Sequence, residues 1–167
     1  MRGDALRLLA GLTNGAARGF IELRLIEPHT RAVRQEFFPL AELEGAVEAA
    51  IAAREDTDAY FGVAPRVREA GGRDAVNAVP AVWVDVDTPA AREVLDAFAA
   101  PPSLVVASGT EGNVHAYWLL ETPTDVATAE RLNRLLAQAI GADPAAVDAS
   151  RILRLPGTLN HKTSPPT

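Results

Sequence analysis

Two aspartates one residue apart, Asp85 and Asp87, end the apolar run Val-Trp-Val-Asp-Val-Asp. Successive residues of a β-strand point to opposite faces, so the two carboxylates share one face and Val82, Val84 and Val86 share the other. Neighbouring carboxylates repel each other, and a divalent cation removes that cost because hard cations prefer carboxylate oxygens. The spacing therefore indicates a Mg²⁺ or Mn²⁺ site, with a pair of solvated acids at a strand end as the alternative.

A second group of polar residues lies at residues 108–118, in the segment Ser-Gly-Thr-Glu-Gly-Asn-Val-His-Ala-Tyr-Trp. Glycines and small residues in such a turn allow backbone N–H groups to approach a phosphate closely. The Ser108 hydroxyl and the His115 ring can each donate a hydrogen bond to a phosphate oxygen. The pattern indicates a phosphate-binding turn that includes Gly109, and an ordinary hairpin with a half-buried histidine is the alternative.

A third acid, Asp148, precedes a cluster of positive charge formed by Arg151, Arg154 and Lys162. Guanidinium and ammonium groups are common partners of phosphates. The alternative is structural, with Asp148 capping a helix and pairing with Arg151. Together, three acids, a glycine-containing turn, a histidine and late cations indicate phosphoryl or nucleotidyl transfer, in which metals and fixed cations offset the charge on a triphosphate.

The elements that must position these residues follow from hydrophobic periodicity. Alternation of apolar and polar residues predicts strands, and apolar residues three or four apart predict helices. Strands interleaved with helices and joined by short hairpins favour an α+β fold with a mostly antiparallel sheet. The tail from Asp143 to Lys162 is predicted to be irregular. The predicted strands are residues 17–27, 31–38, 59–64, 81–87, 103–108 and 113–120, and the predicted helices are 4–12, 40–54, 90–99 and 125–140.

Length and composition limit the class of protein. The chain has 167 residues, 48% hydrophobic and 23% charged, which suits one globular domain over residues 1–167 and excludes wholesale disorder. No apolar run approaches a membrane span, no signal peptide is recognisable, and no cysteine is present, so we expect a cytoplasmic protein without disulfides or thiol chemistry. A net charge of −6 argues against an extended nucleic-acid-binding surface, but not against a local basic groove.

The order of the three polar segments resembles the archaeo-eukaryotic primase superfamily. More narrowly, it resembles the primase-polymerases of phages, plasmids and mobile elements, including RepB-type replication primases. Their signature is an Asp-x-Asp strand, a Ser-Gly-x-x-Gly-x-x-His-like element that runs into an aromatic strand, and a third acid. Residues 151–162 also resemble their Arg-x-Leu-Pro-Gly-Thr-x-Asn-x-Lys segment, and residues 61–66 resemble a strand that precedes the first acid motif.

The resemblance implies a catalytic sheet like that of an RNA-recognition motif, packed with a small N-terminal α/β unit. Residues 1–58 would form the N-terminal unit and residues 59–162 the catalytic part. The resemblance also implies that Asp85, Asp87 and Asp148 hold two Mg²⁺ or Mn²⁺ ions. Since relatives often carry a further helical or zinc-bearing region, this chain is expected to be a catalytic core without it.

The implied reaction is attack of a 3′-hydroxyl on the α-phosphate of an NTP or dNTP, with release of pyrophosphate, on a single-stranded DNA template. His115 would act with the three acids as a catalytic residue. A helicase or accessory domain is a further implied partner, the choice between NTP and dNTP stays open, and the negative net charge predicts weak, salt-sensitive template binding. The implied nucleotide contacts are Ser108, Gly109, His115, Arg151, Arg154, Lys162 and Arg66.

Three other functions compete with this interpretation. A non-catalytic module that binds single-stranded nucleic acid would stack bases on aromatic side chains, but aromatic residues make up only 5% of the chain. A rolling-circle initiator needs a His-x-His metal pair, which His29, His115 and His161 do not form. A two-histidine phosphoesterase finds half of its signature at His161-Lys162-Thr163 and lacks the other half.

Overall fold

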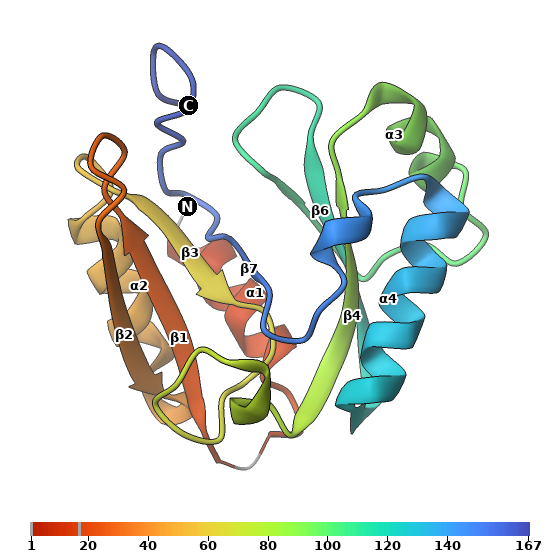
Figure 1. The fold of residues 1–167 in the computed structure, drawn as a ribbon, viewed down its shortest axis with the longest axis horizontal. Coiled ribbons are helices and arrows are strands. Elements are labelled where there is room, and N and C mark those ends of the chain that lie inside the picture. The colour runs from red at the N-terminus through yellow and green to blue at the C-terminus, as the bar shows by residue number, and fades with distance from the viewer. Residues whose placement is uncertain (1, 17) are drawn as a thin grey trace.

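The computed structural model describes residues 2–16 and 18–167, so Met1 and Ala17, the first residue of the predicted strand 17–27, lie outside the described residues. Two antiparallel sheets and the helices that pack against them form the fold (Figure 1), which confirms the α+β class. No helix in the described part of the chain combines the length and apolar character that a membrane span requires. The first sheet has the strand order β2 (Val33–Pro39), β1 (Phe20–Ile26), β3 (Asp58–Gly62), β7 (Ile152–Arg154), and the second has the order β4 (Ala78–Val86), β6 (Val114–Asp125), β5 (Leu104–Ala107).

The helices and strands follow the predicted order. The strands are β1 (Phe20–Ile26), β2 (Val33–Pro39), β3 (Asp58–Gly62), β4 (Ala78–Val86), β5 (Leu104–Ala107), β6 (Val114–Asp125) and β7 (Ile152–Arg154). The α-helices are α1 (Arg2–Leu12), α2 (Leu43–Ala52), α3 (Pro89–Asp96) and α4 (Val126–Ile140). The short 3-10 helices are η1 (Leu40–Glu42), η2 (Arg73–Ala75) and η3 (Pro144–Ala146).

The first sheet has one face for the core and one face for the second sheet. Ile21, Leu23 and Leu25 of β1 are buried in one hydrophobic cluster with residues of α1 and α2, as the alternation of the sequence predicts. The alternate residues Glu22 and Arg24 therefore lie on the opposite face of β1. This opposite face bears the polar groups that the first sheet contributes to the interior of the protein.

The first sheet also contains two strands from the part of the chain after the N-terminal segment. β3 pairs with β1, and β3 pairs in turn with β7. β7 lies in the segment that was expected to be irregular. Three residues are too few to show a period in the sequence, and β7 is a strand because its backbone completes the edge of β3. Through β7, the segment after α4 returns to the first sheet (Figure 1).

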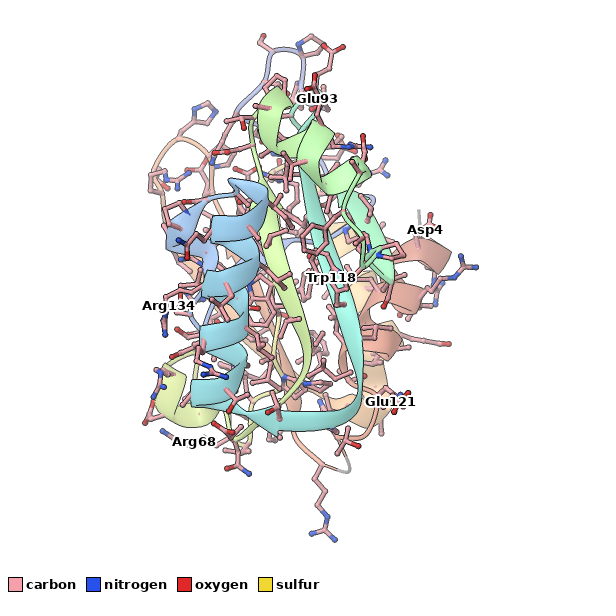
Figure 2. The ribbon with its side chains drawn as sticks, turned by 90° about the vertical axis from the view of Figure 1, so that its right-hand side faces the viewer. Asp4, Arg68, Glu93, Trp118, Glu121 and Arg134 are labelled. Atoms are coloured by element: carbon pink, nitrogen blue, oxygen red, sulfur yellow. The ribbon has the colours of Figure 1, made fainter. Side chains whose placement is uncertain are left out.

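The second sheet places the two aspartates by strand alternation. Val84 and Val86 pack in a second cluster with residues of α3 and α4, and Trp118 of β6 packs against the same cluster on the helix-covered side (Figure 2). Trp83 is buried in the first cluster instead. Because Asp85 has the parity of Trp83, it points away from the helices, toward the first sheet. The prediction that Asp85 lies on the face opposite Val84 and Val86 is confirmed, and Asp87 follows the end of the strand.

Helix α4 and the segment that follows it form hydrogen bonds with β4. The Trp83 N–H donates to Asn133 Oδ1 (2.9 Å), Asn133 Nδ2 donates to Val147 O (3.2 Å), and the Asp143 N–H donates to Asp85 O (2.9 Å). Asn133 is fully buried. One side chain of α4 thus joins the strand that carries Asp85 to the segment that carries Asp148.

We expect Asn133→Leu to lower the free energy of unfolding by about 3 kcal/mol, because the Trp83 N–H and Val147 carbonyl would lose their partner in a buried position. Urea denaturation measures the change. Gln138→Leu makes a similar replacement on the exposed side of α4 and should stay within about 0.5 kcal/mol of the wild type. Equal losses in the two variants would show that the Asn133 bonds do not account for the effect.

Candidate active site

The polar segments singled out in the sequence border one cavity between the two sheets. The cavity has a volume of about 350 Å³. The first sheet contributes residues of β3 and β7, the second contributes residues of β4 and β6, and two loops close the sides. The lining residues are Tyr60, Asp85, Asp87, Ser108, Thr110, Asn113, His115, Arg151, Ile152, Leu153, Arg154, Asn160 and Lys162.

Asp85 carries a carboxylate whose charge is poorly compensated. Burial raises the pKa of Asp85 to about 6, and repulsion from Asp143 and Asp87 adds to the rise, while Arg151 and Lys162 oppose it. Asp87 follows β4 and lines the same cavity. Two carboxylates that face one cavity supply the oxygen ligands that a hard divalent cation prefers.

His115 lies opposite Asp85 in the register between β4 and β6. Its Nε2 is 3.6 Å from Asp85 Oδ1, and the residue is only 4% exposed. Burial, with a smaller effect of Arg154, lowers the pKa of His115 to about 4, so the ring is neutral near pH 7. Its Nδ1 is buried and finds no hydrogen-bond partner within the described residues. A buried ring nitrogen without a partner in the protein needs one from a ligand or from a water molecule.

The turn between β5 and β6 brings further donors to the cavity. The Ser108 N–H donates to Asn113 O and the Asn113 N–H donates to Thr110 O, both at 3.0 Å, and all three residues line the cavity. Gly109 and Gly112 have φ angles of +87° and +80°, in the left-handed region that favours glycine. Gly109 is not a lining residue; its carbonyl accepts a hydrogen bond from Asn160 Nδ2 (2.9 Å).

Asp148 is held beside the cavity and not among its lining residues. Its Oδ2 pairs with Arg151 Nη2 (2.9 Å), and its Oδ1 accepts a hydrogen bond from the Ser150 hydroxyl (2.6 Å). The pairing with Arg151 agrees with the alternative, structural interpretation of Asp148. Across residues 2–16 and 18–167, no group of three His, Asp or Glu side chains is arranged to hold a metal ion.

The four predicted phosphate-binding cations fall into two pairs. Arg151 and Lys162 line the cavity, and Arg151 Nε is buried without a partner among the described residues. Arg154 borders the cavity, but it is 5% exposed and its guanidinium donates to Asp58, Tyr60, Leu159 and Asn160.

Arg66, the fourth of these cations, is fully buried away from the cavity. Its guanidinium pairs with Glu22 Oε2 (2.7 Å) and donates to the carbonyls of Ala149 (3.2 Å) and Ser150 (3.0 Å). The structure therefore does not bring Arg66 to a position where a nucleotide could reach it. Its bonds hold the segment that follows Asp148, so its effect on the cavity is indirect.

Sequence reasoning did not name six of the lining residues, namely Tyr60, Thr110, Asn113, Ile152, Leu153 and Asn160. Tyr60 is an alternate residue of a predicted strand, on the face opposite Phe61, and nothing in the sequence shows what that face meets. Asn160 stood inside the Leu-Pro-Gly-Thr-x-Asn-x-Lys segment, where its place in a motif was the available signal.

Comparison with known proteins gives one family match. The family model described as the RepB DNA-primase N-terminal domain matches residues 44–165, which include every lining residue of the cavity. Among curated proteins, no match to the sequence was found.

Four solved structures resemble the fold over nearly the whole chain, three of them with TM-scores of 0.69 or more. The AEP domain of the cyanophage S-2L primase-polymerase has a TM-score of 0.73 and 23% identity, covering 98% of this chain and 85% of that one. Primase RepB′ has a TM-score of 0.69 and 20% identity, covering 95% of this chain and 52% of that one. The catalytic domain of RepB′ in complex with initiator DNA has a TM-score of 0.69 and 20% identity, covering 96% and 80%. At these identities the likeness shows that the fold is shared.

Proposed function

Since this chain belongs to the RepB DNA-primase N-terminal domain family, we propose that it is a template-directed nucleotidyltransferase that joins nucleotides on single-stranded DNA. The observation that carries the proposal is the convergence of Asp85, Asp87 and His115 from two neighbouring strands, with Arg151 and Lys162 across the same cavity. Acids, a neutral histidine and two cations in one polar cavity are the groups that bind a metal-bound triphosphate.

Asp85 and Asp87 are the residues that would hold the divalent ions, Mg²⁺ or Mn²⁺. The raised pKa of Asp85 and the unpartnered His115 Nδ1 fit a cationic or ligand-bearing site better than a closed structural one. We include Asp148 in this set because the family resemblance implies it; to bind an ion, its carboxylate would have to leave its pair with Arg151 and turn toward the cavity. When bound, the ions would activate the attacking hydroxyl and neutralise charge on the leaving pyrophosphate.

The other lining residues would bind and orient the nucleotide. Arg151 and Lys162 supply positive charge toward the phosphates, and the Ser108 hydroxyl and His115 ring supply hydrogen-bond donors. A neutral His115 accepts or donates at its free nitrogen without adding charge next to Asp85. The 3′-oxygen of a primer would form a bond to the α-phosphorus while the bond to the β-phosphate oxygen breaks, so that pyrophosphate leaves.

DNA is the proposed template and primer, and NTP or dNTP the proposed substrate. A structural neighbour, the RepB′ catalytic domain, was solved with initiator DNA, and another, the polymerase domain of Mycobacterium tuberculosis ligase D (TM-score 0.52, 16% identity, covering 96% of this chain and 77% of that one), was solved with DNA. We further propose that the two sheets work as one catalytic unit, because β3 and β7 of the first sheet and β4 and β6 of the second line the same cavity.

The test is incorporation of labelled NTPs or dNTPs by the purified chain on a primed single-stranded template, with Mg²⁺ or Mn²⁺. We expect template-dependent extension, equal release of pyrophosphate, and complete loss of both on chelation. A pure binding module would retain the template with or without metal and would extend no primer under either ion. That result would exclude the proposed enzyme.

A further inference from the structure

Asn160 lies where the loop after β7 meets the turn between β5 and β6, and it is only 2% exposed. Its Nδ2 donates to Gly109 O (2.9 Å) and to Thr110 Oγ1 (3.3 Å). Its Oδ1 accepts from Arg154 Nη2 (2.9 Å) and from the Lys162 N–H (3.2 Å). A carboxamide has two donor hydrogens and two acceptor lone pairs, so all four are used within the chain. Asn160 therefore lines the cavity with no hydrogen-bonding capacity left for a ligand.

The orientation of Asn160 is set by a buried ion pair. Arg154 Nη1 donates to Asp58 Oδ1 (3.0 Å) and to Leu159 O (2.7 Å), and Asp58 also accepts the His161 N–H (3.0 Å). Although burial acts to raise it, hydrogen bonds from His161 and Arg154 hold the pKa of Asp58 below its usual value. Turning Arg154 toward a nucleotide would leave an ionised, 1% exposed carboxylate without its cation, which is strongly unfavourable.

Gly109 of the turn also packs closely against the Asn160 side chain. A Cβ atom added at Gly109 would lie 2.7 Å from Asn160 Cβ, closer than two carbon atoms can pack. The Thr167 hydroxyl donates to the same Gly109 carbonyl that Asn160 holds. The turn is thus fixed from the side of the C-terminal loop, and the backbone of Lys162 is fixed by the same carboxamide.

We propose that Asn160 is a positioning residue: it sets the 108–113 turn and Lys162 on one side of the cavity, in an orientation imposed by the buried Arg154–Asp58 pair, without contacting the nucleotide. This inference rests on the proposed function, since it assigns Asn160 a role in binding the triphosphate through Ser108, Thr110 and Lys162. It also assigns Arg154 to the framework of the site and not to the phosphates.

The test compares Asn160→Asp and Asn160→Ala with Thr158→Ala as the matched control. Asn160→Asp keeps the acceptor for Arg154 and Lys162 but places an oxygen against the Gly109 carbonyl. Thr158 lies in the same loop, is 8% exposed, and donates to Leu155 O (2.7 Å) without touching the turn. The readouts are kcat and KM for the nucleotide, the Kd of inorganic tripolyphosphate, and hydrogen exchange of residues 108–113.

We expect both Asn160 variants to raise KM and the tripolyphosphate Kd about tenfold, with kcat within about threefold, since loss of buried hydrogen bonds to the turn weakens binding and leaves the acids in place. Exchange in the turn should accelerate in the Asn160 variants and not in Thr158→Ala. A fall in kcat at unchanged KM, or equal changes in the Thr158 control, would overturn the inference. If the wild type incorporates no nucleotide, the proposed function fails, and the exchange and tripolyphosphate measurements still decide the role of Asn160.

Discussion

Replacing Asp85 with Asn is expected to reduce nucleotide incorporation at least about a hundredfold, because the neutral amide removes the charge at the centre of the proposed metal site. Asp85 faces His115 across the strand pair and is the carboxylate that repulsion from Asp87 affects. Primer extension under saturating Mg²⁺ or Mn²⁺ measures the loss. Asp125→Asn is the control: Asp125 caps α4, away from the cavity, and Asn preserves a cap. Near-normal synthesis by Asp85→Asn would remove this residue from catalysis.

The same substitution is expected to stabilise the metal-free protein above pH 6. The pKa of Asp85 is raised from 3.8 to about 6 on folding, so the folded state binds more protons between these values. The free energy of unfolding therefore falls as pH rises through this interval, and Asn at position 85 escapes the loss. Urea denaturation with a chelator present should show Asp85→Asn more stable than the wild type at pH 7.5, with the difference closing near pH 4. A less stable variant at pH 7.5 would show that the Asp85 charge is already compensated.

The face of β4 that carries Asp85 and Asp87 could be predicted because strand alternation is a local property. Val84 and Val86, which alternate with the aspartates, had to be buried together, and they are. The pairing of Asp85 with His115 could not be predicted, because register is fixed by the β4–β6 ladder and not by either segment alone. The sequence therefore indicated candidate residues for the site but not which of them lie next to each other.

For the arginines, residue type alone does not predict which side chains are available to bind phosphate. Arg66 and Arg154 have the same side chain as Arg151, and all three are typical of phosphate binding. Arg66 and Arg154 are instead bound by buried acids, Arg66 by Glu22 of β1 and Arg154 by Asp58 of β3. The sequence pattern shows which face of each strand carries the acid, but not what that face packs against. Only the packing of the two sheets shows that this face is interior, where each acid requires a cation.

Arg66→Met is expected to lower the free energy of unfolding by about 3 kcal/mol, the lower end of the range for breaking a buried ion pair. Both Arg66 and Glu22 are fully buried, so the variant leaves Glu22 without its principal partner. We expect a value at the lower end of that range because Glu22 keeps two other partners. Arg24 pairs with Glu22, and Gln35 Nε2 donates a hydrogen bond to Glu22 Oε1 (2.6 Å). Urea denaturation measures the change. Arg68→Met is the control, since the Arg68–Asp74 pair is exposed and should contribute less than about 1 kcal/mol.

The double variant Glu22→Leu with Arg66→Met separates stability from function. Replacing both charges with apolar groups should restore most of the unfolding free energy, because neither member of the fully buried pair is left as an unpaired charge. Arg24, which also loses Glu22, has a side chain that is 29% exposed and can be solvated. It cannot restore the hydrogen bonds from Arg66 to the carbonyls of Ala149 and Ser150, which hold the segment between Asp148 and Arg151. We therefore expect a folded protein whose nucleotide incorporation stays well below that of the wild type. Recovery of both stability and incorporation would show that the segment keeps its place without Arg66, and that the buried pair serves the fold alone.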